Sequence, residues 1–362
     1  MPFGESRPPL LRGRLIESAV SHCFKPRSQG TPFYRQNEGW MTPLTFEPIL
    51  KRIRWGGRQL GELLGKNIGA ESDYAESWEL ADHEDGQSVV NQGPLVGQTL
   101  QQLREQSGLD LFGRHTGLDQ FPLLIKFLDA NDWLSLQVHP NDEQAKRYDP
   151  TENGKTEAWI ILDAQPDSQI CAGLKAGLSQ QQLADHLQNG TLKECLNIFS
   201  VKPGDCVMVP AGTVHAIGPG IVLVEIQQQS NVTFRLCDWG RVGRDGQPRE
   251  IHLEESLACI DFDCGPVMPV TPLVLSDGDH LHEELVRDQH FVIRRHRTDQ
   301  PFRITTDNQF HILIVLDGVA NMESSEGSQV LPRGSTILIP AVNEAVKVTP
   351  DGPTIVLDVF LP

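Results

Sequence analysis

The chain has 362 residues, which is enough for one or more domains of the ordinary size of about 100 to 200 residues, each with its own core. Hydrophobic residues make up 39% and charged residues 22%, a composition that excludes a chain disordered throughout. The net charge of −17 disfavours binding of the whole molecule to nucleic acid or anionic lipid, so a negatively charged ligand needs a local positive pocket.

The first segment, residues 1–41, differs in composition from the rest. It carries Pro8-Pro9, several basic residues and few long apolar runs, and it ends at a second methionine, Met41. We expect an N-terminal extension outside the main fold. A start of translation at Met41 and an ordinary surface arm are the two alternatives.

Residues 42–265 are dominated by short apolar runs between Gly, Pro, Asp and Asn, which is typical of strands and predicts a mainly β fold. The clearest expected strands cover residues 123–128, 133–138, 158–162, 205–209 and 221–226. Leucines at spacings of three to five predict two helices over 179–199, separated at Asn189-Gly190. Shorter helices are expected at residues 60–64 and 143–148.

A Pro-rich stretch over residues 266–272 predicts a linker, and a second set of β-type runs follows to residue 362. The run from Gly204 to Pro210-Ala211 resembles the run from Gly334 to Pro340-Ala341. Eleven residues after the two glycines stand His215 and Ala345, respectively. We interpret this as a duplicated β unit that kept its chemistry in one copy, although the pattern can also recur by chance. The expected domains are therefore 42–265 and 266–362.

Three separate motifs in the first expected domain carry side chains of the types that bind metals in proteins. Gln137 and His139 stand two apart at the end of an expected strand, which places them on one face. Glu157 begins another strand, and a Pro-Ala-Gly turn precedes His215. Two imidazoles, a carboxylate and an amide oxygen make a metal site with positions left for water or substrate.

A second histidine-rich motif, His280-Leu281-His282-Glu283, also contains possible ligands. It is surrounded by acidic residues such as Asp277 and Asp279, and we expect it to be a solvated loop.

The motifs of the first domain occur in the order of a cupin metal site, and together the chain resembles the type I mannose-6-phosphate isomerases (phosphomannose isomerases) in their compact bacterial form. The similarity extends from about residue 44 to residue 262 and continues weakly to the end. It is carried by Trp55-Gly56-Gly57, Glu76-Ser77-Trp78-Glu79, Gln137-Val138-His139-Pro140-Asn141-Asp142, Gly154-Lys155-Thr156-Glu157, residues 210–218, Glu225-Ile226-Gln227-Gln228 and Thr233-Phe234-Arg235.

This resemblance implies a fold of two cupin-like (jelly-roll) β-barrels, with a small helical insertion near 179–199 in the first and no metal site in the second. It implies one Zn²⁺ per chain, bound by Gln137, His139, Glu157 and His215. The implied reaction interconverts mannose 6-phosphate and fructose 6-phosphate through a cis-enediol(ate). It also implies that Ser135 and Arg241 contact the phosphate of the substrate and that Arg235 lies in the active site.

The chemistry of the residues agrees with such a reaction, because an enediolate needs positive charge beside its oxygens. Lys155 stands two residues before Glu157 and is expected to face the same cavity. We name Lys155 first as the base that moves the proton, since a neighbouring cation favours its neutral amine. Glu225 and a zinc-bound hydroxide are the alternatives. Glu76 is expected to support its neighbours or to bond to the backbone.

Two other functions are compatible with a cupin site: an Fe(II) oxygenase and a sugar-phosphate-binding protein without activity. Gln137 as a fourth ligand, together with Lys155 and Arg235, argues against an oxygenase. The presence of Lys155, Glu157, His215 and Arg235 argues against a binding protein without activity.

The expected location is the cytoplasm. No run approaches the about 18 apolar residues that span a bilayer, no leader pattern begins the chain, and the seven cysteines show no Cys-x-x-Cys spacing. The sequence leaves the oligomeric state open, and we take a monomer as the expectation.

Overall fold

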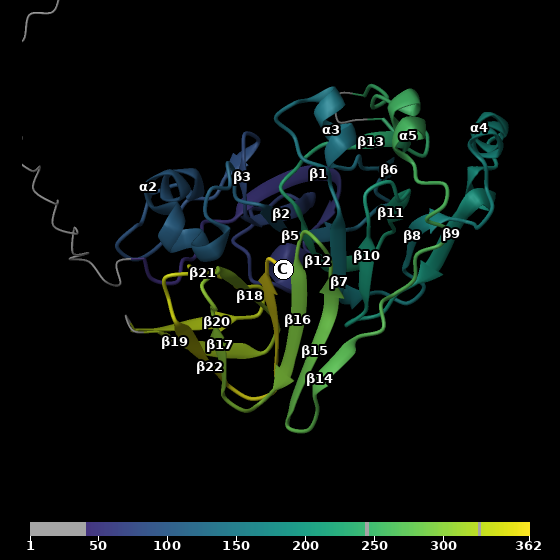
Figure 1. Cartoon of the computed structure of the whole chain (residues 1–362). Coiled ribbons are helices and arrows are strands. Elements are labelled where there is room, and N and C mark those ends of the chain that lie inside the picture. Colours follow the sequence, from purple (N-terminus) through teal and green to yellow (C-terminus); the bar gives the residue numbers. More distant parts are fainter. Residues whose placement is uncertain (1–40, 243–245, 325–326) are drawn as a thin grey trace, which may run out of the picture. The chain divides into compact units, whose positions relative to one another are not determined.

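Antiparallel β-strands form most of the fold, as the short apolar runs predict (Figure 1). The structure is a computed structural model that describes residues 41–242, 246–324 and 327–362. The predicted N-terminal extension lies outside the described residues except for Met41, which is buried. The mainly β fold class with a small helical part is confirmed.

The segment 44–265 contributes two large sheets and one short ladder. A six-stranded sheet has the order β1 (Ile49–Gly57), β2 (Tyr74–Leu80), β5 (Leu123–Ala130), β12 (Ile221–Gln228), β7 (Glu157–Ala164) and β10 (Cys206–Val209). A five-stranded sheet has the order β13 (Phe234–Cys237), β6 (Leu136–Val138), β11 (His215–Ile217), β8 (Gln169–Leu174) and β9 (Leu196–Ser200). The ladder pairs β3 (Asp82–His83) with β4 (Gly86–Gln87). Trp159, Leu223 and Ile170 belong to one cluster that joins the two large sheets.

The segment after residue 272 repeats this arrangement with two further sheets. A six-stranded sheet has the order β14 (Leu273–Ser276), β15 (His280–Arg287), β16 (Val292–Thr298), β23 (Thr354–Phe360), β18 (His311–Asp317) and β21 (Thr336–Ile339). A four-stranded sheet has the order β17 (Phe302–Thr305), β22 (Ala345–Pro350), β19 (Val319–Ser324) and β20 (Gly327–Pro332). Leu313, Val346 and Val356 are among the residues of the cluster between them.

The strand register supports the predicted duplication. The two repeated runs form β10 and β21, and each is the edge strand of its six-stranded sheet. Val209 of β10 lies opposite Glu157, and Ile339 of β21 lies opposite His311. In the second copy His311 therefore occupies the position of Glu157, and Ala345 begins the strand that corresponds to β11.

The two six-stranded sheets share one hydrophobic core. Ile125 and Ile226 of the first sheet belong to the same cluster as Ile312 and Leu357 of the other. The described residues from Met41 onward belong to one compact unit, within which the boundary near residue 265 and the closure of the sheets into two barrels stay predictions.

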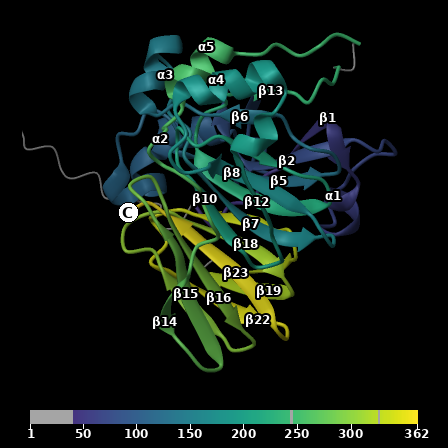
Figure 2. The same cartoon turned by 90° about the vertical axis from the view of Figure 1, so that its right-hand side faces the viewer.

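Helices lie mainly at the ends of the sheets (Figure 2). The helical elements are α1 (Gln59–Glu62), α2 (Leu100–Phe112), the 3₁₀ helix η1 (Gly113–His115), α3 (Asp142–Tyr148), α4 (Gln180–Asn189), the 3₁₀ helix η2 (Leu192–Cys195) and α5 (Leu253–Cys259). The structure confirms α1, α3 and the first helix of 179–199, whereas α2 and α5 were not predicted. Thr99 caps α2 through a capping box with Gln102, a signal that the sequence does contain.

The second helix predicted over 179–199 is wrong. Gly190 ends α4 with a φ of 70°, a left-handed conformation that glycine adopts easily. The chain then forms η2 and the strand β9, which pairs with β8. The apolar residues there follow sheet pairing, a long-range contact that overrides their helix-like spacing. The strand predicted over 133–138 is also shorter than expected, since only residues 136–138 belong to β6.

The solvated loop predicted at residues 280–283 is wrong as well. These residues begin β15, and His282 lies opposite His296 of β16. The imidazoles of His280, His282 and His296 contact one another, with centroids 4.1 to 6.0 Å apart. Pairing with β14 and β16 makes this segment a strand and buries Glu283, whereas His280, Leu281 and His282 stay partly exposed.

Among the helices of the described ranges, none combines the length and the apolar character that crossing a membrane requires.

Candidate metal centre and its cavity

Strand pairing brings the four predicted metal ligands together. Gln137 lies on β6, and His139 follows the end of that strand. His215 is the first residue of β11, which pairs with β6 so that His215 lies opposite Gln137. Glu157 is the first residue of β7 in the other sheet. The site therefore lies between the two large sheets of residues 44–265.

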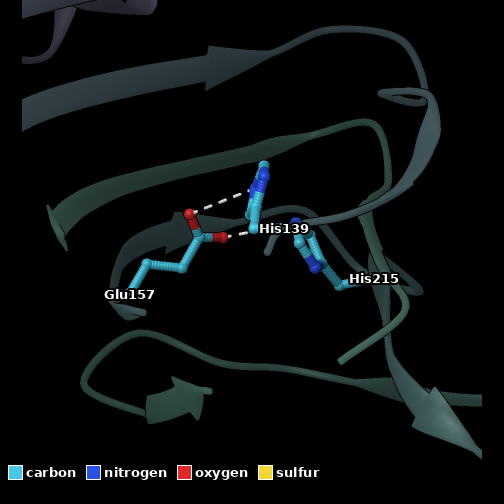
Figure 3. A group of neighbouring side chains, drawn as sticks. All are labelled: His139, Glu157 and His215. Atoms are coloured by element: carbon cyan, nitrogen blue, oxygen red, sulfur yellow. Dashed lines mark ion pairs between the residues drawn. The ribbon is translucent and has the colours of Figure 1, made fainter. Parts of the chain in front are cut away.

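Three of these side chains form a tight buried group (Figure 3). Each of His139, Glu157 and His215 offers a ligand atom within 4.8 Å of the other two. The carboxylate bridges the imidazoles, with Glu157 Oε2 3.6 Å from His139 Nε2 and Oε1 3.4 Å from His215 Nε2. All three residues are only 1% exposed. No other group of three or more such ligands was found among the described residues.

The backbone orients both imidazoles. His139 Nδ1 lies 2.8 Å from the carbonyl oxygen of Val232, and His215 Nδ1 lies 2.8 Å from that of Thr213. Because a carbonyl can only accept, each Nδ1 donates a proton and each Nε2 presents its lone pair to Glu157. This arrangement of an anchored Nδ1 and an open Nε2 is typical of histidines that bind metals.

The group also contains buried polar atoms without hydrogen-bond partners, as expected of a site that binds a cation. His139 Nε2 and both carboxylate oxygens of Glu157 are buried without a hydrogen-bond partner among the described residues. Buried polar atoms normally have partners, so such a set indicates a ligand between them. Nitrogen and carboxylate ligands in this number suit Zn²⁺ or a similar transition metal.

Burial sets the charge state of the group. It lowers the pKa of His215 to about 4 and lowers the pKa of His139 well below its ordinary value, with Lys155 adding to the effect on His139. Burial, and then the negative charge of Glu225, raises the pKa of Glu157. The imidazoles are thus neutral, which is the form that binds a metal.

Gln137 lies beside the group. Its Nε2 is 3.2 Å from His215 Nε2, and its Oε1 is 3.4 Å from Ser135 Oγ. A half turn of the amide would exchange the two atoms and direct the oxygen to the ligand set, since both ends have nearly the same shape. Gln137 as a fourth ligand stays a prediction.

A cavity of about 350 Å³ adjoins the group. Its lining includes the predicted residues Ser135, Gln137, Lys155, Glu225 and Arg235. Lys155 connects the cavity to the group, because its Nζ lies 3.4 Å from Glu157 Oε2. The structure therefore places these five residues around one space.

Arg241 lies elsewhere. It is not among the residues that line the cavity, and its guanidinium binds Asp132, the carbonyl oxygen of Trp133, and Asp238. The predicted contact of Arg241 with a phosphate finds no counterpart in this arrangement and stays a prediction.

Sequence reasoning missed a buried lysine in the cavity. Lys126 is 4% exposed, and its Nζ lies 3.0 Å from Glu225 Oε1 and 3.8 Å from Glu76 Oε2. Burial alone would lower the pKa of Lys126, but Glu225 and Glu76 raise it above its ordinary value. Burial alone would likewise raise the pKa of Glu225, but Lys126 and Lys155 lower it. A single lysine inside the apolar run 123–128 was the available signal, since buried lysines are rarely unpaired.

The cavity combines groups that can exchange protons with groups that stabilise anions. Four basic side chains, Lys126, Lys155, Arg235 and Arg249, and two acidic ones, Glu76 and Glu225, are among the lining residues. The excess of positive charge stands out in a chain of net charge −17. Such a cavity suits a negatively charged ligand that undergoes proton transfer beside a metal.

Comparisons with known proteins show the family of the chain. The family model described as "Phosphomannose isomerase type I, catalytic domain" matches residues 44–164. The mannose-6-phosphate isomerase ManA of Bacillus subtilis is 38% identical over 300 residues, covering 82% of this chain and 93% of that protein. The mannose-6-phosphate isomerase of Streptococcus mutans is 32% identical over 298 residues, with coverage of 82% and 92%. The crystal structure of the mannose 6-phosphate isomerase from Bacillus subtilis superimposes with a TM-score of 0.82 at 28% identity, covering 88% of this chain and 99% of that one.

Proposed function

Because the chain belongs to the type I phosphomannose isomerase family, we propose that it interconverts mannose 6-phosphate and fructose 6-phosphate in the cavity beside His139, Glu157 and His215. The observation that carries the proposal is a buried group of metal-type ligands beside a cavity that two proton-transfer candidates, Lys155 and Glu225, and Arg235 line. A sugar phosphate of six carbons is a small anionic ligand, which suits the excess of positive charge.

We propose that Zn²⁺ binds to His139, Glu157 and His215, with Gln137 as the fourth ligand. When bound, the cation would supply positive charge to oxygens that become negative during the reaction. The anchored Nδ1 atoms keep both imidazoles in the tautomer that this ligand set needs.

The proposed reaction moves a proton between C2 and C1 of the open-chain sugar through a cis-enediolate. Lys155 is the first candidate for the base, because it lines the cavity and lies directly beside Glu157. Glu225 is the alternative base. It lines the same space, and its ion pair with Lys126 keeps it in the carboxylate form.

In this proposal Arg235 transfers no proton but stabilises negative charge. Its guanidinium lines the cavity and can bind the enediolate oxygens or the phosphate. Ser135, which precedes β6 and has its Oγ 3.4 Å from Gln137 Oε1, is a further candidate for binding the phosphate. A cytoplasmic location and a monomeric state stay predictions.

The test is a coupled assay that follows fructose 6-phosphate formed from mannose 6-phosphate, together with metal analysis of the purified protein. We expect turnover that a chelator abolishes and that added Zn²⁺ restores. Absence of turnover at every metal loading would contradict the proposal and favour a binding protein. Iron in the protein with consumption of oxygen would instead favour an oxygenase.

A further inference from the structure

The cavity contains an arginine that the sequence motifs did not single out. Arg249 lines the space together with Arg235, although it lies fourteen residues later in the chain, after β13. It is partly buried, with 24% of its side chain exposed. Arg249 thus lines the cavity, whereas Arg241, for which the resemblance implies a phosphate contact, does not.

Asp238 holds Arg249 in this position. Arg249 donates from Nε to Asp238 Oδ2 over 2.8 Å and from Nη2 to Oδ1. A guanidinium bound to a carboxylate through two parallel hydrogen bonds has a fixed plane and direction. Asp238 is itself only 4% exposed, so the pair forms a rigid part of the wall.

The same carboxylate also binds Arg241. Arg241 Nη2 lies 2.6 Å from Asp238 Oδ1, and Arg241 Nε donates to the backbone oxygen of Asp238. Burial alone would raise the pKa of Asp238, but the hydrogen bonds from Arg249 and Arg241 hold it below its ordinary value. One negative charge therefore serves two guanidinium groups.

Arg235 adds a third guanidinium with no carboxylate of its own. Its Nη1 donates to the backbone oxygen of Glu250 over 2.8 Å, and its Nε is buried without a partner. Among the described residues Arg235 forms no ion pair. Burial, and then the positive charge of Arg249, lowers the pKa of Arg235, whereas the negative charge of Asp238 opposes this. A buried donor without a partner beside a second arginine indicates that an anion completes the group.

We propose that Arg249, together with Arg235, binds the phosphate group of the substrate, and that Asp238 is the residue that positions Arg249. Arg241 then acts only behind Asp238 and does not contact the phosphate. This inference rests on the proposed function for the identity of the substrate. The anion site itself depends on the cavity, the contacts of Asp238 and the unpartnered Arg235 Nε.

The experiment compares Arg249→Ala with Arg241→Ala and with the surface control Arg147→Ala on α3, whose side chain is 68% exposed. Binding of inorganic phosphate is measured by calorimetry, and KM and kcat for mannose 6-phosphate by the coupled assay. Loss of a charge-assisted contact predicts a rise of about 10- to 100-fold in the KM and in the Kd for phosphate in Arg249→Ala. Metal content and kcat should change far less than KM, and Arg147→Ala should match the unmodified protein.

Two further variants separate positioning from a structural role. Arg249→Lys keeps the charge but loses the fork with Asp238, so it should bind phosphate with an affinity between those of Arg249→Ala and the unmodified protein. Asp238→Asn should raise KM and leave the metal content unchanged. A role in stability alone would lower the melting temperature without changing the affinity for phosphate, and this result would contradict the proposal.

The outcomes also separate this inference from the proposed function. Phosphate binding that depends on Arg249 in a protein that does not turn over mannose 6-phosphate would support the anion site and refute the isomerase. Turnover and phosphate binding unchanged in Arg249→Ala but lost in Arg241→Ala would refute the inference, and would return the phosphate contact to Arg241.

Discussion

Each side chain of the proposed metal site depends on partners that are distant in sequence. His139 donates to the carbonyl of Val232, 93 residues away, and both imidazoles approach one carboxylate, that of Glu157. The ligand atoms are therefore held in position by the folded backbone, and the removal of one ligand should affect metal binding more than the fold.

His215→Ala should lose the metal and the isomerase activity. Loss of a partner behind a ligand typically costs about 10- to 100-fold in affinity or activity, so loss of the ligand itself should cost at least that much. Metal analysis and the coupled assay provide the measurement, with circular dichroism to verify folding. His186→Ala, on α4 and outside the site, is the matched control. Unchanged metal content in His215→Ala would remove this residue from the ligand set.

The ion pair of Lys126 and Glu225 is buried at the wall of the cavity and should be sensitive to loss of one partner. Lys126→Met leaves the carboxylate without its counter-charge, which we expect to lower the free energy of unfolding by about 3 to 5 kcal/mol. Denaturant unfolding measures this change, and Lys126→Met with Glu225→Gln should recover part of it. Lys347→Met, which breaks the exposed pair with Glu323, should change stability by less than about 1 kcal/mol. Equal effects of the two single variants would contradict the prediction.

At the scale of elements, strand pairing decides the environment of the second histidine group. The register places His282 and His296 of the second copy where Glu76 and Leu128 stand in the first. The same strands that line a polar cavity in the first copy therefore carry stacked imidazoles in the second, with His296 only 4% exposed. The imidazoles pack against one another in their neutral form, because protonated imidazoles at this distance would repel one another.

This packing predicts that acid destabilises the protein through His296. Burial lowers the pKa of His296 to about 3, and His280, His282 and Arg294 around it add to this, whereas Asp358 opposes it. The unfolded chain takes up this proton below a pH of about 6.5 and the folded chain does not. The free energy of unfolding should therefore fall as the pH decreases from about 6.5 towards 3, by up to about 1.4 kcal/mol per pH unit for this group. His296→Leu should show a shallower decrease in denaturant unfolding between pH 7 and 5, and an equal slope would refute the assignment.

At the scale of the whole molecule, the described part of the chain is joined by a core that both segments share. Phe310, after β17, packs against Phe121 at 4.8 Å and against Phe112 of α2 at 6.1 Å between ring centroids. The C-terminal end of α2 also bonds to the later segment, where Ala341 N donates to the oxygen of Leu111. Residues before and after the predicted boundary near 265 should therefore unfold together.

Phe310→Ala provides the test. All six tryptophans lie at or before Trp239, so their fluorescence reports on the part of the chain before the predicted boundary near residue 265. Loss of the buried ring should lower the free energy of unfolding by about 3 to 5 kcal/mol, and the tryptophan fluorescence should register the change. Val330→Ala, at a residue that is 67% exposed, is the control in the same segment. A fluorescence transition that stays at its original denaturant concentration would show that the segments unfold independently.

Local signals in the sequence were enough to predict the mainly β fold class, the helices α1, α3 and α4 and the three residues of the His–Glu–His group, because turn residues, caps and strand alternation act between near neighbours. The predicted residues Ser135, Gln137, Lys155, Glu225 and Arg235 do line the cavity, but Lys126 and Arg249 were not predicted there. Lys126 pairs with Glu225. Arg249, which lines the cavity, and Arg241, which does not, both bind Asp238. Those positions, like the strand β9 in place of a helix and the imidazole contacts between β15 and β16, depend on contacts between different segments of the chain. Such contacts become known only with the folded structure. A buried charge needs an opposite charge beside it and an apolar surface needs a packing partner, and the fold brings both from distant parts of the chain.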